Sequence, residues 1–104
     1  MENKTKAETF IGFAIRARKF RIGVNASLTL KSANLVIVCN SASDNTKKDA
    51  DKIAKKFNCP IIETKEKKLE ELTHRENAKV MCVCDKKLSE AILNNSEEDF
   101  IARN

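Results

Sequence analysis

The stretch LVIVC, Leu35 to Cys39, is apolar at every position. A strand with one solvated face alternates apolar and polar side chains, whereas a strand covered on both faces is apolar throughout. LVIVC therefore predicts a central strand with helices on each side of its sheet. The run VMCVC, Val80 to Cys84, predicts a second core strand, in which the cysteines act as small hydrophobic residues.

Helical and strand patterns alternate on both sides of these runs. Thr5 and Glu8 form a capping box in front of a helix over residues 6–18, in which Gly12 suggests that something packs closely. Short strands are expected over 20–24 and 61–63, and a polar loop over 73–79. A second helix is expected from its cap Asn25 to about Ala33. Three further helices are expected to begin at the caps Ser43 or Asp44, Thr64, and Asp85. The acidic tail from about residue 95 is expected to fray, although Phe100 and Ile101 could dock.

This alternation predicts a single α/β domain over residues 1–104, a sandwich with a mostly parallel sheet and helices on both faces. No apolar run approaches the ~20 residues that a membrane span needs. The start, MENKTKAETF, holds no hydrophobic signal segment, so we expect a cytoplasmic protein without a membrane partner. In that reducing compartment, the four cysteines do not imply disulfides.

The net charge of +5 comes from the first 34 residues, which hold seven basic side chains and two acidic ones. Four of the basic side chains lie in the run RARKFR, directly before the turn Gly23-Val24-Asn25: Arg16, Arg18, Lys19 and Arg21. Cationic side chains beside the free N–H groups of a helix start favour phosphate binding. The alternative is a solvated helix end, whose charge complements the helix dipole.

Several classes of site are disfavoured by composition. The two glycines, Gly12 and Gly23, are too few for a dinucleotide-binding or Walker loop. With one histidine and no placed nucleophile and base, an enzyme is disfavoured. The chain has no Trp or Tyr, and Phe10 and Phe57 fall on helix core faces, which argues against a base-stacking platform. What remains is recognition of a shaped RNA by a basic helix end and polar loops.

The cysteines offer a rival hypothesis. Cys82 and Cys84 alternate along one strand and so share a face, where they could hold a soft metal, with Cys39 as a further thiol. The sequence lacks CxxC pairs, and His74 stands at no ligand spacing. We therefore favour buried hydrophobic cysteines and expect no metal and no cofactor. A thiol or metal-binding protein stays open as the alternative function.

Four segments resemble a known family. IGFAIRARK (Ile11 to Lys19), the Gly23-Val24-Asn25 turn, LVIVCNSASDNTKK (Leu35 to Lys48) and FNCPII (Phe57 to Ile62) are similar to the ribosomal protein superfamily of L-seven-Ae and L-thirty-e, and most of all to its bacterial YlxQ-type branch. The resemblance spans roughly residues 6–95. It implies a three-layer α/β/α sandwich with a four-stranded mixed sheet. It also implies non-catalytic binding of kink-turn RNA, in which tandem sheared G·A pairs lie beside a three-nucleotide bulge.

The resemblance assigns roles to particular residues. Gly23 and Asn25 match the family's G-x-N-E turn, where the second helix meets the G·A pairs, and the Asn25 amide would read base edges. Lys19 and Arg21 would contact phosphates, and the loop from Thr73 to Asn77 would close over the bulged nucleotides. The full set of expected RNA-binding residues is Arg16, Arg18, Lys19, Arg21, Gly23, Asn25, Lys31, Thr73, His74, Arg75, Glu76 and Asn77.

The sequence also departs from the family. Ala26 and Thr29 stand where the family has glutamate and lysine, which makes Lys31 a candidate substitute for the lysine. Glu70 and His74 replace the glycines of the L-G-x-x-x-G pattern. The leading hypothesis is a monomeric RNA-binding protein, associated with the ribosome or a structured RNA. A domain that keeps the fold but binds protein instead of RNA is the third alternative.

Overall fold

The computed structural model describes residues 5–103, and Glu2 and Lys4, which enter the charge count, lie outside that range. Helices and strands alternate along the described residues, as the sequence patterns predict. The elements are α1 (Lys6–Arg16), β1 (Phe20–Ile22), α2 (Val24–Leu28), β2 (Leu35–Val38), α3 (Asp44–Phe57), β3 (Ile61–Thr64), α4 (Leu69–Thr73), β4 (Val80–Val83), α5 (Lys86–Asn94) and β5 (Phe100–Ala102).

The strands form one mixed sheet in the order β1-β4-β2-β3-β5. The prediction of a central strand at LVIVC is confirmed, because β2 lies in the middle of the sheet and Leu35–Val38 are fully buried. The sheet differs from the expectation in two details. Across the described residues it has five strands, not four, and only the β2–β3 pair, joined through α3, is parallel. β4 inserts antiparallel between β1 and β2, an order that alternation along the chain does not encode.

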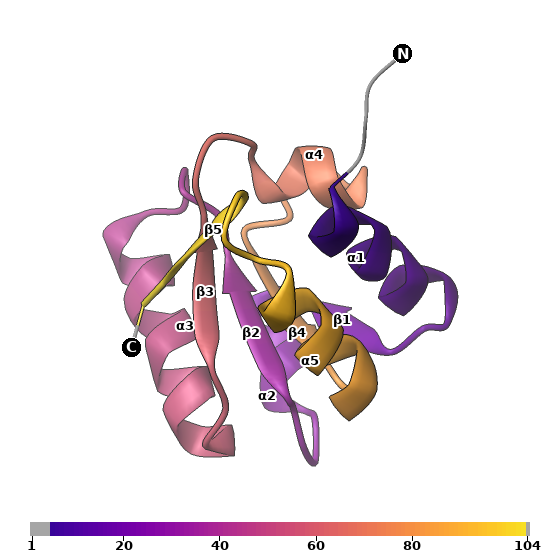
Figure 1. Cartoon of the computed structure of the whole chain (residues 1–104). Helices are drawn as coiled ribbons and strands as arrows, with labels where there is room; N and C mark the ends of the chain where they lie inside the picture. The colour runs from indigo at the N-terminus through magenta and orange to yellow at the C-terminus, as the bar shows by residue number, and fades with distance from the viewer. Residues whose placement is uncertain (1–4, 104) are drawn as a thin grey trace.

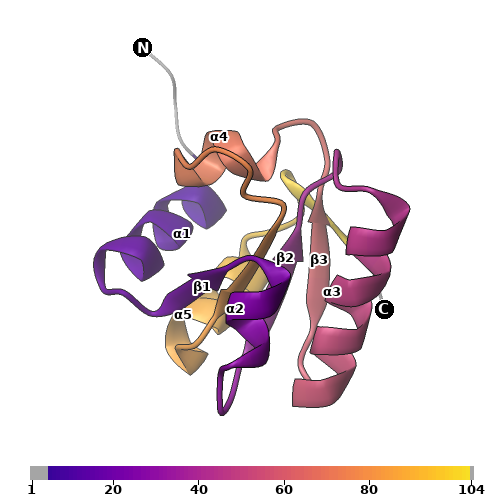
Figure 2. The ribbon, with the colours of Figure 1, turned by 180° about the vertical axis from the view of Figure 1, so that it is seen from behind.

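Helices lie in front of the sheet in both views. In Figure 1, α5 lies before the sheet with α1 beside it, and α4 packs on α1. In Figure 2, which shows the opposite side, α2 lies before the sheet with α3 beside it. α1 buries the apolar stripe that its sequence predicts, Ala7, Ile11 and Ala14, whereas on α2 Leu28 is exposed. Within the described residues, no helix has the length and apolar character needed to cross a membrane.

The tail does not fray as the sequence predicts. Phe100 is buried and β5 pairs with β3, so the docking alternative is correct for Phe100, whereas Ile101 stays exposed. Arg103 anchors the end of the strand with hydrogen bonds to the carboxylates of Asp51 (2.8 and 3.0 Å) and Glu63 (2.7 Å). These long-range ion pairs outweigh the local acidic composition.

Caps confirm some predicted helix starts and correct others. Ser43 and Asp85 accept backbone hydrogen bonds as N-caps of α3 and α5. The side chain of Thr64, expected to cap α4, is instead buried in β3, where it accepts a hydrogen bond from the Asn40 N–H (2.9 Å). The expected close packing at Gly12 is wrong, since a Cβ placed there would meet no atom of residues 5–103 within 4 Å.

Candidate nucleic-acid interface

A surface hollow of about 400 Å³ lies where the end of α1, strand β1, helix α2 and the α4–β4 loop meet. Arg18, Arg21 and Arg75 line it from three separate segments. Its apolar lining comes from Ile15, Phe20, Ile22 and Ala26. All three arginines are exposed, and we call this hollow the arginine hollow. The structure thus brings together predicted RNA-binding residues that are distant in the sequence, since Arg18 and Arg75 lie 57 positions apart.

The turn after α1 sets the direction in which the basic run, Arg16 to Arg21, enters β1. α1 ends at Arg16, two residues before its expected end, because Arg18 adopts a left-handed backbone with φ of 59°. The N–H of Arg18 bonds to Ile15 O (3.1 Å) and that of Lys19 to Ala14 O (2.9 Å), a Schellman motif in which glycine is the usual residue. The Cys84 N–H then bonds to Lys19 O (2.8 Å), which fixes the entry into β1.

An aromatic contact holds Arg75 over the sheet edge. Its guanidinium carbon lies 5.1 Å from the ring centroid of Phe20, within the range of a cation–π interaction. Arg21 donates to the Phe20 carbonyl oxygen (2.8 Å). The Arg75 guanidinium is therefore held against the Phe20 ring and that of Arg21 against the Phe20 backbone, which limits their motion before any ligand arrives.

The turn at Gly23 differs from the expectation in one respect. Gly23, not Asn25, is the N-cap of α2, with φ of 101° and ψ of 152°, a conformation that is essentially restricted to glycine. Asn25 is the second helical residue; its side chain is exposed and makes no hydrogen bond to any described residue. It does not line the arginine hollow, which Ala26 reaches instead. The Asn25 amide is therefore available to a ligand and has no capping role.

Glu70 holds the loop from residue 73 to 77, a role that sequence patterns did not predict, since Glu70 stood out only as the replacement of a family glycine. Its carboxylate accepts hydrogen bonds from the Asn77 N–H (2.9 Å) and from Lys79 Nζ (2.6 Å). The Lys79 bond is the main cause that holds the pKa of Glu70 below its ordinary value. His74 and Asn77 have φ of 58° and 61°, so the loop turns through two left-handed residues.

The remaining residues that were predicted to bind RNA do not line the arginine hollow. Thr73 is buried, and its hydroxyl donates to Leu69 O (2.9 Å), so it presents no side chain to an RNA. His74 and Glu76 are exposed on the loop. Arg16 lies over the Phe13 ring, with its guanidinium carbon 5.0 Å from the centroid. Lys31 lies in the segment that joins α2 to β2, at the opposite end of α2 from the α4–β4 loop (Figure 2), and does not line the arginine hollow.

In residues 5–103, no three His, Cys, Asp or Glu side chains cluster in an arrangement that could hold a metal ion. Cys82 is fully buried, and this burial raises the pKa of its thiol to about 11. Burial also raises the pKa of half-buried Cys84. Burial alone would raise the pKa of Cys39, but hydrogen bonds with Ser41 and Leu69, together with Lys79, hold that pKa below its ordinary value. Cys82 in particular stays a protonated core side chain at neutral pH.

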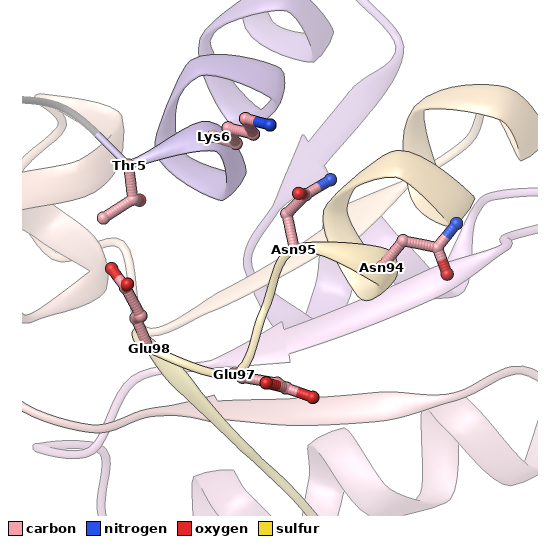
Figure 3. Close-up of a pocket in the computed structure, with 6 residues that line it drawn as sticks. All are labelled: Thr5, Lys6, Asn94, Asn95, Glu97 and Glu98. Carbon is pink, nitrogen blue, oxygen red and sulfur yellow. The ribbon is translucent and has the colours of Figure 1, made fainter.

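A different hollow of about 420 Å³ lies between the start of α1 and the turn after α5. Figure 3 shows Glu98 pointing toward Thr5 at the start of α1, whereas Glu97 points away from it. The two carboxylates repel a polyanion, so this hollow does not fit the RNA hypothesis.

Comparisons with known proteins bear on the fold. No family model and no curated protein matches the sequence. Among solved structures, a protein of unknown function from Bacillus halodurans matches with a TM-score of 0.75. The two sequences are 22% identical, and the match covers 90% of this chain and 99% of that chain. The likeness shows the fold alone. Any assignment of function therefore rests on the residues of the site.

Proposed function

We propose that the protein is a non-catalytic RNA-binding module that recognises kink-turn RNA through the arginine hollow, Asn25 and the loop over residues 74–77. The convergence of Arg18, Arg21 and Arg75 on one hollow carries the proposal, because clustered arginines match phosphate geometry and no acidic residue among residues 5–103 lines the hollow. The three-layer arrangement of the resembling superfamily belongs to the same proposal, with α1 and α5 on one face and α2 and α3 on the other.

The proposed contacts are of two kinds, one with phosphates and one with base edges. Arginines and Lys19 would neutralise phosphates and position the RNA without reading its sequence. The exposed Asn25 amide offers a donor and an acceptor together, as contact with a base edge requires. In the cell this module would act in the cytoplasm as a monomer, on ribosomal RNA or another structured RNA.

A titration with a kink-turn RNA tests the proposal, with an RNA whose G·A pairs are disrupted as the control. We expect tighter binding to the intact RNA, and weaker binding when Arg21 or Arg75 is replaced by glutamine. Lys52→Gln, an exposed change on α3, serves as the matched protein control. Equal binding of the two RNAs would contradict kink-turn recognition, and no binding of either would favour the protein-interaction alternative.

A variant at Ala26 provides a second test in the same titration. It lines the arginine hollow at the position where the resembling family has glutamate. Ala26→Glu would place a carboxylate beside Arg18 and Arg21, with acceptors for base amino groups. We expect Ala26→Glu to sharpen discrimination in favour of intact G·A pairs, although it adds a negative charge.

A further inference from the structure

A second groove, of about 280 Å³, lies between α1 and α4. Its lining includes Glu8, Gly12, Ile15 and Arg16 from α1, with Leu72 and His74 from α4 and its cap. Ile15 lines both this groove and the arginine hollow, so the two are neighbours on the surface. One of its lining residues has a buried oxygen atom without a hydrogen-bond partner among residues 5–103.

That group is the carboxylate of Glu8. The Thr-x-x-Glu pattern predicts that Glu8 returns to the Thr5 N–H, yet only half of the capping box forms: Thr5 accepts from the Glu8 N–H (3.2 Å). The Glu8 side chain is 10% exposed, and its Oε2 is buried without a hydrogen-bond partner among residues 5–103. Its Oε1 lies 3.7 Å from Lys67 Nζ, too far for a hydrogen bond. Buried polar atoms are normally paired, so Oε2 retains the capacity to accept a hydrogen bond from a ligand.

The rest of the groove has a complementary character. Arg16 lies eight residues after Glu8, about 12 Å along the helix axis at 1.5 Å per residue. Between them Gly12 lines open space, because a Cβ there would meet no atom within 4 Å. Ile15 and Leu72 supply apolar walls. The groove therefore offers an acceptor from Glu8, a cation from Arg16 and apolar contact from Ile15 and Leu72, with Thr9 and Thr73 completing its lining.

We propose that this groove binds an unpaired guanine, with the base edge on Glu8 and its phosphate at Arg16 and His74. A carboxylate only accepts hydrogen bonds, and guanine places two donors, N1–H and N2–H, side by side on one edge. Adenine and cytosine place an acceptor beside their amino group, and uracil flanks its donor with two acceptors. That an RNA supplies the guanine rests on the proposed function. A free guanine nucleotide offers the same two donors and the same phosphate.

A guanidinium from a partner protein also presents paired donors. The groove disfavours it, because Arg16 lines the other end and the chain carries a net charge of +5. The phosphate of a nucleotide complements that end. A nucleotide thus satisfies both charged ends at once.

The first test is a titration of the isotopically labelled protein with guanosine 5′-monophosphate and, separately, adenosine 5′-monophosphate, followed by amide chemical shifts. We expect shifts at the groove residues and stronger binding of the guanosine nucleotide. Glu8→Gln should weaken it about tenfold, as the loss of a paired base contact does. Glu66→Gln, an exposed change between β3 and α4, should leave it unchanged.

A second variant, Gly12→Leu, tests the groove without changing Glu8. Gly12→Leu should fill the groove and remove nucleotide binding while raising the melting temperature, because leucine favours a helix more than glycine does. Gly12→Ala is the matched control, which gains the same helix preference but leaves most of the space. Unchanged binding to Gly12→Leu, or equal binding of the two nucleotides, would overturn the proposal.

Two further arms separate this proposal from the proposed function. A kink-turn RNA with an added unpaired guanine beside the bulge should bind more tightly than one with adenine there, and Gly12→Leu should abolish the difference. If the protein binds no kink-turn RNA but still prefers guanosine 5′-monophosphate at the groove, the proposed function fails and the groove binds a free nucleotide. Stronger binding of arginine amide than of guanosine 5′-monophosphate would show a protein partner and refute the guanine assignment.

Discussion

Glu70 Oε1 accepts a hydrogen bond from Lys79 Nζ at 2.6 Å, while its Oε2 holds the Asn77 N–H at 2.9 Å. One carboxylate therefore ties the α4–β4 loop to the start of β4. Lys79 extends the network to the Ser41 hydroxyl (2.9 Å). Bonds to charged groups are stronger than neutral ones, so this network fixes the loop before any ligand binds.

We predict that Glu70→Gln loosens the loop. The amide keeps the size of the side chain but loses the charge that holds Lys79. Amide hydrogen exchange at Asn77 should become faster, and affinity for kink-turn RNA should fall several-fold. The control Glu66→Gln removes an equal charge from an exposed site, so an equal fall in that variant would attribute the effect to net charge.

The salt dependence of RNA binding tests the basic run. Each phosphate that a basic side chain neutralises contributes roughly −0.7 to −0.9 to the slope of log K against log salt. Replacing Lys19 and Arg21 together with alanine should therefore flatten the slope by about 1.4 to 1.8. Lys52 and Lys55, exposed on α3, form the matched control pair. A slope unchanged by the Lys19 and Arg21 variant would indicate that the run is only a solvated helix end.

Replacing Asn25 tests its proposed contact with a base edge and removes no helix cap, because Gly23 is the N-cap of α2. Asn25→Ala should keep the free energy of unfolding within about 0.7 kcal/mol, since alanine is the better helix former. It should lose about 1–3 kcal/mol of preference for intact G·A pairs, measured by paired titrations. Undiminished preference would place the base-reading surface elsewhere. Gly23→Ala should instead destabilise the fold by about 1–3 kcal/mol through strain at φ of 101°.

The cysteines distinguish the RNA and metal hypotheses. Cys82→Ala should reduce stability by about 1 kcal/mol through the cavity left in the core, and the half-buried Cys84→Ala by less. RNA affinity should stay unchanged in both variants. Elemental analysis of the wild-type protein provides the decisive comparison: stoichiometric zinc or copper that disappears in the double variant would support the metal alternative.

The ion pair of Asp51 with Arg103 gives a pH dependence. The hydrogen bond from Arg103 holds the pKa of Asp51 below its ordinary value of 3.8. The pair therefore stabilises the fold above that value, and its contribution is lost as the pH falls through the lowered pKa. Urea unfolding should show Asp51→Asn to be less stable than wild type at pH 7, with the difference shrinking in acid. A constant difference would rule out ionisation as its cause.

Local sequence patterns predicted the central strand and most helices, because burial and capping are visible in short segments. Leu35–Val38 is fully buried, and Ser43 and Asp85 cap the helices that follow them. The strand order and β5 could not be predicted in this way. Both depend on contacts between distant residues, such as Arg103 with Asp51, which leave no local periodicity.

The candidate site was predictable in part. Composition located the basic run, and the resemblance suggested the loop, but neither placed Arg18, Arg21 and Arg75 around one hollow. Glu70 was visible only as a missing family glycine, and its partners Asn77 and Lys79 required the fold. The shift of the cap from Asn25 to Gly23 follows from a backbone conformation that the sequence does not specify.

The left-handed backbone at Arg18 and His74 also has an evolutionary consequence. Each residue occupies a conformation that glycine adopts at lower cost, and each lies at the proposed RNA surface. Glycine at either position would relieve the backbone strain but remove the side chain, so a gain in backbone stability there competes with ligand recognition during evolution.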